Sequence, residues 1–197
     1  MPRFDRLTSH AVALPAQDID TDQIIPARFL KAVDRSAMGE NLFADWRRLP
    51  GGSPDPTFPL NRPTSAGAHI LLAGNNFGCG SSREHAVWAL TGAGFQAVIA
   101  ESFADIFRNN ALKNGLLPVA VPEESIQDLF ARVERDPYTS FTIDLTEQTL
   151  SFADLPPVQF EIDPFARRCL LDGVDQLGYL LKHVDRIAEY EAAHGVD

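Results

Sequence analysis

A glycine-rich loop carries the residues best suited to chemistry. Residues 74–85 read Gly-Asn-Asn-Phe-Gly-Cys-Gly-Ser-Ser-Arg-Glu-His, between an apolar strand-like run and a helical run. The hydroxyls of Ser81 and Ser82 and the guanidinium of Arg83 therefore stand where a helix begins. Free N–H groups and the positive end of the helix dipole favour an anion there, and Arg83 adds a planar fork for a carboxylate or phosphate. The pattern predicts an acid-binding catalytic corner.

A purely structural alternative exists for the same residues. Ser81 and Glu84 have the spacing of a capping box, in which the serine caps the helix and the glutamate reaches back to it. One cap, however, needs neither a second serine nor the adjacent cation of Arg83. Both interpretations stay open at the level of the sequence.

Other loop chemistries fit this segment less well. A nucleoside-triphosphate loop needs Gly-Lys-Ser/Thr, which the chain lacks. Arg83 occupies the place of the third glycine of a dinucleotide fingerprint. A nucleophile elbow around Ser81 would need glycine at positions 79 and 83, which hold Cys79 and Arg83. Nucleotide binding and serine hydrolysis are therefore disfavoured.

An acidic loop near the N-terminus is the second polar feature. Asp18, Asp20 and Asp22 alternate like the start of a calcium loop, but Gln23 and Phe29 replace its glycine and its final glutamate. The spacing therefore disfavours calcium. Either the carboxylates bond nearby backbone N–H groups in a turn, or one of them orients a catalytic group on another chain.

Composition limits the possible function classes. The chain has 197 residues, 45% of them hydrophobic, and a formal net charge of −10, which argues against nucleic-acid binding. No apolar run approaches the length of a membrane span or of a signal-peptide core, so we expect a cytoplasmic protein. Cys79 and Cys169 are the only cysteines, too few to hold an iron–sulfur cluster or a structural zinc.

Hydrophobic patterning predicts one α/β domain over 1–197, with 183–197 as a C-terminal helical tail. The part before residue 66 is rich in turns, with a brief helix at 29–33. Alternating elements then predict a parallel layer: strands at 69–73, 97–100 and 117–121, and helices at 82–92, 102–113 (capped by Ser102) and 123–135. Later segments predict an antiparallel patch and two more helices: strands at 141–145, 149–152 and 159–162, a helix from 164, and a helix at 183–193.

Four segments in register resemble a known family. They are residues 20–26, 77–86, 102–107 and 165–175. Together they are similar to the small subunits of 3-isopropylmalate dehydratase, the isomerase of leucine biosynthesis, in the superfamily of the aconitase C-terminal (swivel) domain. The resemblance covers about residues 4 to 192.

This resemblance implies a fold, a partner and a reaction. The fold is a β/β/α swivelling domain, a mixed sheet or half-barrel with flanking helices. The chain would bind no cofactor or metal itself and would act only in a heterodimer with a large subunit that carries a [4Fe–4S] cluster. The reaction is the dehydration of a hydroxy diacid followed by rehydration, which moves the hydroxyl from one carbon to the next.

The resemblance also implies roles for individual residues. Ser81 would be the catalytic base, with its alkoxide favoured by the helix N-terminus and by Arg83. Ser82 and Arg83 would hold a substrate carboxylate. Asp22 would support a histidine of the cluster-bearing subunit, and Arg35 is a candidate second carboxylate clamp. Cys79 and His85 are expected to pack beside the corner without a catalytic role.

One segment departs from the family pattern. Where these subunits usually carry Arg-Thr-Gly-Phe-Gly, this chain has Arg35-Ser36-Ala37-Met38-Gly39, in the loop thought to sense the side group of the substrate. A related diacid of the citraconate or dimethylmaleate type is therefore an alternative substrate. A non-catalytic module that binds a diacid is the alternative from a different function class.

Overall fold

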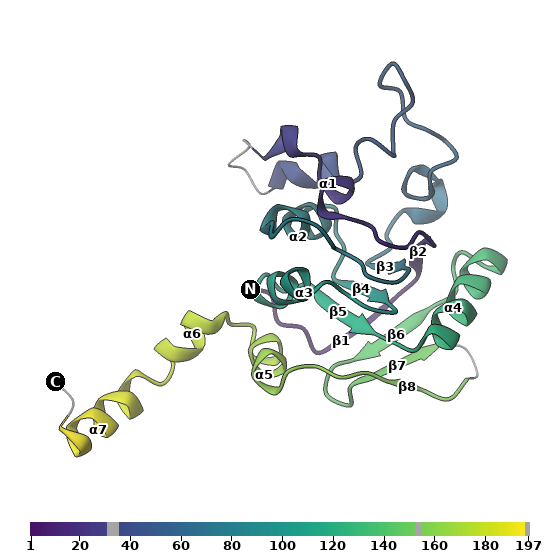
Figure 1. The fold of residues 1–197 in the computed structure, drawn as a ribbon. Coiled ribbons are helices and arrows are strands. Elements are labelled where there is room, and N and C mark those ends of the chain that lie inside the picture. Colours follow the sequence, from purple (N-terminus) through teal and green to yellow (C-terminus); the bar gives the residue numbers. More distant parts are fainter. Residues whose placement is uncertain (31–35, 153–154, 196–197) are drawn as a thin grey trace.

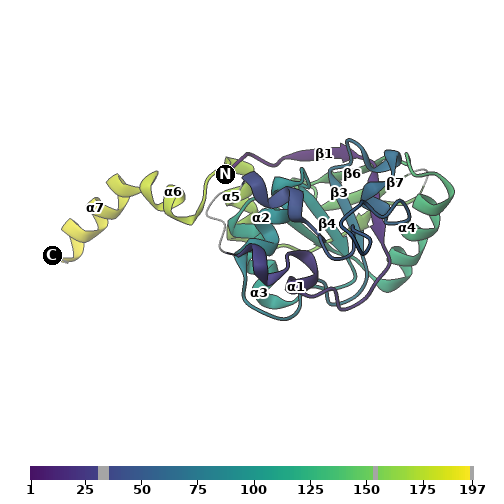
Figure 2. The ribbon, with the colours of Figure 1, turned by 90° about the horizontal axis from the view of Figure 1, so that it is seen from above.

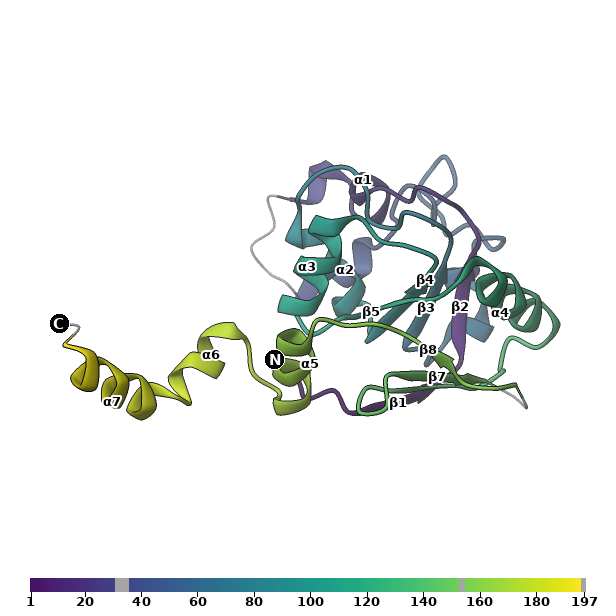
Figure 3. The same cartoon turned by 60° about the horizontal axis from the view of Figure 1, so that its bottom comes forward.

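The chain folds into three layers, two sheets and a layer of helices. The computed structural model describes residues 1–30, 36–152 and 155–195. Figure 3 shows an antiparallel sheet at the bottom, a parallel sheet above it, and helices on the outer face of the parallel sheet. This arrangement confirms the predicted β/β/α fold.

The middle layer is a four-stranded parallel sheet in the order β2-β3-β4-β5. Its strands are β2 (Ala11–Leu14), β3 (Ile70–Ala73), β4 (Ala97–Ala100) and β5 (Leu117–Ala120). Every residue of β3 and β4 is buried, as expected for parallel strands that are covered on both faces. The strands predicted at 69–73, 97–100 and 117–121 are therefore confirmed to within a residue at each end.

The outer layer is a four-stranded antiparallel sheet in the order β1-β6-β7-β8. Its strands are β1 (Arg6–Ser9), β6 (Phe141–Asp144), β7 (Thr149–Phe152) and β8 (Val158–Gln159). Buried and half-buried residues alternate along β6 and β7, so one face of this sheet packs inward and the other is partly open to solvent. The strands of the predicted half-barrel thus form two separate sheets.

Two hydrophobic cores lie on the two faces of the parallel sheet. Because side chains alternate along a strand, Ile70 and Leu72 of β3 enter the core shared with the antiparallel sheet, while Leu71 and Ala73 enter the core beneath the helices. The helix α4 (Glu123–Arg135) packs into the first core along one stripe of buried residues, Ile126, Leu129 and Val133.

The helices of the outer layer pack closely on one another. The helices α2 (Glu84–Gly92) and α3 (Asp105–Lys113) follow β3 and β4 and lie on the same face of the sheet (Figure 1). The 3-10 helix η2 (Ser36–Asn41) packs on α2, with the ideal Cβ position of Gly39 only 2.2 Å from the backbone of Gly92. Only glycine at position 39 permits this approach.

Several sequence predictions were wrong in detail. The strands β1 and β2 lie in the part predicted to be rich in turns, where no strand was expected, and α2 begins at Glu84 rather than at residue 82. The strand predicted at 159–162 is the two-residue β8. Of the brief helix predicted at 29–33, the structure has the 3-10 helix η1 (Ala27–Phe29), and 31–33 lie outside the described residues.

The C-terminal segment leaves the body of the molecule. The helix α5 (Pro164–Asp172) packs against the body, and α6 (Gln176–Leu181) and α7 (Val184–His194) then project away from it in all three views (Figures 1, 2 and 3). The sequence predicted α7 but not α6. None of the helices in the described ranges combines the length and the apolar character that a membrane-crossing segment needs.

Candidate active site

Three segments far apart in the sequence meet at one edge of the parallel sheet. The loop that starts at Pro15 follows β2, the glycine loop 74–83 follows β3, and the segment 101–104 follows β4. Because the strands are parallel and adjacent, their carboxyl ends lie side by side, which is where open α/β sheets place their sites. The topology therefore brings together three of the four segments that carry the family resemblance.

The first two loops bind each other through their main chains. Isolated bridge pairings join Asp20 to Cys79 and Phe77 to Phe103. Three backbone hydrogen bonds connect the acidic loop to the glycine loop: Asp18 N to Asn75 O at 2.9 Å, Gly78 N to Ile19 O at 2.7 Å, and Thr21 N to Cys79 O at 2.9 Å. The glycine loop is therefore held by the acidic loop and by the β4 segment together.

Thr21 is the side chain that fixes the backbone of Ser81. Its hydroxyl donates to the Ser81 carbonyl and accepts from the Ser81 N–H, both at 3.2 Å, and the residue is only 1% exposed. Sequence reasoning gave Thr21 no role beyond membership of a motif. Its place between two aspartates in the acidic loop was the only available signal.

An aromatic cluster supports the loop from below. The rings of Phe77 and Phe107 meet edge to face with centroids 5.1 Å apart, and Phe103 stacks on Phe107 at 6.2 Å. Gly78 has a φ of +78°, and its ideal Cβ would lie 2.2 Å from the ring of Phe107. The loop can rest on this cluster because position 78 has no side chain.

Ser102 was predicted to cap α3, and this prediction was wrong. The helix begins at Asp105 with Ala104 at the cap position. The Ser102 hydroxyl instead accepts from the Asn76 N–H at 2.9 Å and donates to the side chain of Asn75. Ser102 therefore joins the third segment to the glycine loop, a contact that local sequence cannot reveal.

Ser81 and Ser82 lie on the surface just before α2. The cap position is Arg83, in an extended conformation and with no side-chain capping bond, so the capping box of Ser81 and Glu84 does not form. Both serines are exposed, and neither hydroxyl has a hydrogen-bond partner in the described parts of the chain. The hydroxyls are thus available at the positive end of a helix.

A capping box does form, but in the acidic loop. The Asp20 carboxylate accepts from the Gln23 N–H at 2.8 Å, and the Gln23 side chain accepts from the Asp20 N–H at 2.9 Å. These two bonds begin the short helix α1 (Thr21–Ile24). They confirm the interpretation in which the Asp20 carboxylate bonds a nearby backbone N–H group in a turn. Asp18 accepts from the side chain of Asn76 at 2.7 Å.

Asp22 and Arg83 form an ion pair across the two loops. One Asp22 oxygen contacts a guanidinium nitrogen of Arg83, and the two side chains are 53% and 23% exposed. The three aspartates of the acidic loop therefore point to three different partners. Among the described residues, no group of three or more His, Cys, Asp or Glu side chains is placed to hold a metal ion.

The predicted second clamp, Arg35, lies outside the described residues, as do the side chains of Ser36 and Ala37. Met38, the other departure from the family pattern, is 1% exposed and belongs to the core beneath the helices. Met38 therefore packs in the core and presents no side chain at the surface.

Cys79 and His85 pack beside the corner as expected. The Cys79 thiol donates to the Asp18 carbonyl at 3.4 Å. Burial raises the pKa of the Cys79 thiol, and the carboxylates of Asp20 and Asp18 raise it further, which disfavours a thiolate. The His85 ring packs on Trp88 with centroids 4.6 Å apart.

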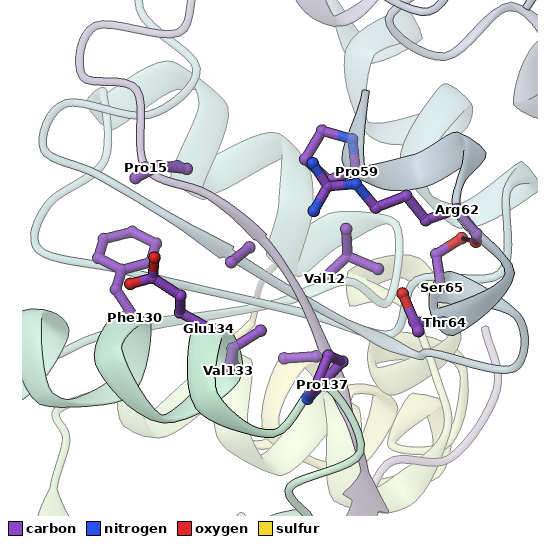
Figure 4. Close-up of a pocket in the computed structure, with 12 residues that line it drawn as sticks. Val12, Pro15, Pro59, Arg62, Thr64, Ser65, Phe130, Val133, Glu134 and Pro137 are labelled. Carbon is purple, nitrogen blue, oxygen red and sulfur yellow. Dashed lines mark hydrogen bonds between the residues drawn. The ribbon is translucent and has the colours of Figure 1, made fainter. Parts of the chain in front are cut away.

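The corner is open rather than enclosed. The best-formed cavity in the described ranges, about 420 Å³, lies elsewhere, between α4, the edge of β2 and residues 59–65 (Figure 4). Asp22, Ser81 and Arg83 do not line this groove, and Ser81 and Ser82 lie exposed at the surface of the described part of the chain. A substrate at the corner would need a second surface to enclose it.

Comparisons with known proteins agree on one family. The model of the aconitase C-terminal domain matches residues 1–124. A 3-isopropylmalate dehydratase small subunit from Roseiflexus castenholzii is 59% identical over 188 residues, which is 95% of this chain and 92% of that protein. Its counterpart from Chloroflexus aurantiacus is 57% identical over 194 residues, 98% and 96% of the two chains.

A solved structure is similar as well. The crystal structure of a 3-isopropylmalate dehydratase from Methanocaldococcus jannaschii superimposes with a TM-score of 0.68 at 29% identity. The match covers 94% of this chain and 99% of that one. The similarity therefore includes the body of the fold and the corner at its sheet edge.

The close approach of the glycine loop to Phe107 leads to a stability prediction. Gly78→Ala should lower the free energy of unfolding by about 3–5 kcal/mol, because the added methyl group overlaps the ring and the backbone is left-handed. Gly80→Ala is the matched control, since its φ is +92° but its Cβ would meet nothing closer than 3.5 Å. Gly80→Ala should lower the free energy of unfolding by only about 1–2 kcal/mol. Chemical denaturation measures both, and equal costs would contradict the packing argument.

The contact between Thr21 and Ser81 predicts a local change. Thr21→Val keeps the shape of the side chain but removes its hydroxyl, so the Ser81 amide should exchange with solvent faster, by about 5- to 150-fold for a loss of about 1–3 kcal/mol. Thr21→Ser keeps the hydroxyl and should preserve the protection. Hydrogen exchange resolved at Ser81 measures both variants. Equal exchange in all three proteins would mean that Thr21 does not hold this amide.

Proposed function

Because this chain belongs to the family of 3-isopropylmalate dehydratase small subunits, within the aconitase C-terminal domain superfamily, we propose that its exposed corner is the proton-abstracting half of a shared active site. The chain is the small subunit of a hydro-lyase of leucine biosynthesis that interconverts 2-isopropylmalate and 3-isopropylmalate through 2-isopropylmaleate. A large subunit is its partner in a heterodimer. The names of the relatives favour isopropylmalate over citraconate or dimethylmaleate, and catalysis over simple diacid binding.

The chemistry requires a base beside a carboxylate clamp. Dehydration removes a proton from a carbon next to a carboxylate, and this carbon acid is weak. The negative charge that develops needs cations and N–H groups around it. The observation that supports the proposal is that the free, exposed Ser81 hydroxyl lies two residues from the Arg83 guanidinium at the start of α2.

Ser81 is the proposed base. Its backbone is held on both sides by Thr21, so the hydroxyl is presented from a fixed loop rather than from a mobile one. A serine hydroxyl is a weak base, but the positive end of α2 and the adjacent guanidinium stabilise its alkoxide form. The proton taken from the substrate carbon then resides on the Ser81 oxygen and returns to the neighbouring carbon on rehydration.

Arg83 is the proposed carboxylate clamp, with Ser82 beside it. In the chain alone the fork of Arg83 is occupied by Asp22. A substrate carboxylate would replace the Asp22 carboxylate at that fork, and Asp22 would then be free to support a histidine of the large subunit. The ion pair thus neutralises both groups until the partner and the substrate arrive. Arg35 stays a proposed second clamp.

The group that assists departure of the substrate hydroxyl must come from outside this chain. Cys79 and Cys169 belong to different elements, both are free thiols whose pKa burial raises, and no set of cluster ligands surrounds either in the described ranges. The residues of this chain therefore do not fit an iron–sulfur cluster. We place the [4Fe–4S] cluster in the large subunit, as a part of the proposal.

Replacement of Ser81 tests the base. In the complex with the large subunit, Ser81→Ala should lower kcat by about 10²- to 10⁴-fold, the usual contribution of a general base, with little change in KM. Ser82→Ala is the neighbouring control and should mainly raise KM. Steady-state kinetics on both isopropylmalates, with assembly checked by sedimentation, measures this. A Ser81→Ala complex with near-normal kcat would remove Ser81 from the role of base.

Replacement of Arg83 tests the clamp. Arg83→Lys keeps the charge but loses the planar fork, so kcat/KM should fall by about tenfold or more. Arg168→Lys is the matched control, because Arg168 also pairs with an aspartate, Asp172, but on α5. It should leave the kinetics unchanged. If both variants keep normal kcat/KM, Arg83 does not bind the carboxylate.

A further inference from the structure

The C-terminal arm, residues 176–194 of α6 and α7, carries an unusual share of the exposed apolar surface. Six of the eleven large hydrophobic side chains that are exposed in the described residues lie on it: Leu177, Leu180, Leu181, Val184, Ile187 and Tyr190. No residue of either helix is buried. Helices in water gain stability chiefly by burying an apolar face, so this surface needs a cover.

The exposed residues form a stripe along each helix. On α7, Val184, Ile187 and Tyr190 recur every three residues, while Asp185, Glu189 and Ala192 lie on the opposite side. Figures 1 and 2 show both helices standing clear of the two sheets. The stripe therefore does not pack on the body of the chain that carries it.

The base of the arm is fixed to the body. Tyr179 of α6 meets the ring of Phe165 on α5 edge to face at 5.0 Å, and Asp175 caps α6 through the Gly178 N–H at 2.7 Å. The Gly173 N–H also bonds the Leu170 carbonyl at the end of α5. The ring contact between Tyr179 and Phe165 therefore joins the first helix of the arm to α5.

The surface of the arm continues toward the catalytic corner. A groove between α3 and α5 is lined by Gln176 and Phe165 at the base of the arm and by Asn109 of α3, and a second groove runs from Asn109 to Asp105. Ile106, 52% exposed, lies beside Asp105 at the start of α3, directly after the segment that bridges to the glycine loop. One partner can therefore cover the arm and the corner together.

Charge argues against a second copy as that partner. The segment 174–195 has four acidic and two basic residues, and the whole chain has a formal net charge of −10. The two grooves at the base of the arm are lined by three acidic residues, Asp105, Glu161 and Asp163, against two basic ones, Arg108 and Lys113. Two copies would bring acidic surfaces together, whereas an apolar groove edged by Lys and Arg would match both the stripe and its rim.

We propose that the arm is a docking element that binds an apolar, basic-edged groove of the large subunit and holds that subunit over the Ser81 corner. This inference rests on the proposed function for the existence of the partner. Beyond that function, the arm identifies where the large subunit binds and which kind of surface the large subunit presents to this chain. The arm touches no reacting atom, so it contributes to assembly and not to the chemical step.

The test uses the full chain and its cognate large subunit. Ile187→Asp and the double variant Leu181→Asp/Ile187→Asp place acid in the stripe, and Ala192→Asp places the same acid on the polar side of α7. The stripe variants should weaken binding of the large subunit by about 30-fold or more, as for interface anchor residues, while Ala192→Asp changes it less than about threefold. Calorimetric titration measures this, and kcat at saturating small subunit should stay unchanged.

Three results would overturn the proposal. One is equal affinity for all the variants. Another is a stripe variant that loses kcat even at saturation. The third is a wild-type chain that dimerises alone at micromolar concentration in sedimentation and does so through the stripe, which would assign the arm to a second copy. Because binding is measured without turnover, inactivity of the wild-type complex would refute the proposed function and leave the docking result intact.

Discussion

The structure of the corner depends on the contact between two loops at the carboxyl edge of the parallel sheet. Main-chain hydrogen bonds from the acidic loop to the glycine loop hold the latter in place, and the Thr21 hydroxyl binds both polar groups of the Ser81 peptide backbone. These bonds use backbone groups, so they leave the side chains of Ser81 and Ser82 free. A loop that exposes two hydroxyls can therefore still be well ordered.

This contact is possible because of what lies beneath it. Gly78 rests directly on the ring of Phe107, and Phe77 and Phe103 pack around the same ring. The aromatic cluster belongs to the core between the parallel sheet and the helices. The stability of the sheet is thus transmitted to the loop, and the corner sits on a rigid edge rather than on a flexible extension.

The corner and the arm are both incomplete in the chain alone, in opposite ways. At the corner, polar groups are exposed or neutralise each other, as Asp22 and Arg83 do. On the arm, apolar side chains face solvent along two helices without a buried residue. Both features agree with the proposed role, in which the corner forms one half of an active site and the arm binds the subunit that supplies the other half.

Much of the fold was predictable from local pattern. The long helix α4 and the short buried strands β3 and β4 follow from the pattern of apolar residues, because burial imposes a repeat of 3.6 on a helix and leaves continuous apolar runs in parallel strands. The strands β1 and β2 have the same four-residue length as β3 and β4, but β1 has a single apolar side chain, Leu7, and both strands lie in the part of the chain where turn residues dominate the local pattern. The helix α6 was missed because its six residues make fewer than two turns, too few to show a helical repeat.

By itself, the sequence determined the family and most of the long elements, and it placed Ser81 and Arg83 beside the start of a helix. Tertiary structure alone decided which polar groups meet. Asp22 and Arg83 are 61 residues apart, Thr21 and Ser81 are 60 apart, and Ser102 binds the glycine loop instead of capping its own helix. Such contacts follow from the parallel order of the strands, which brings their carboxyl ends together, and no local pattern encodes that order.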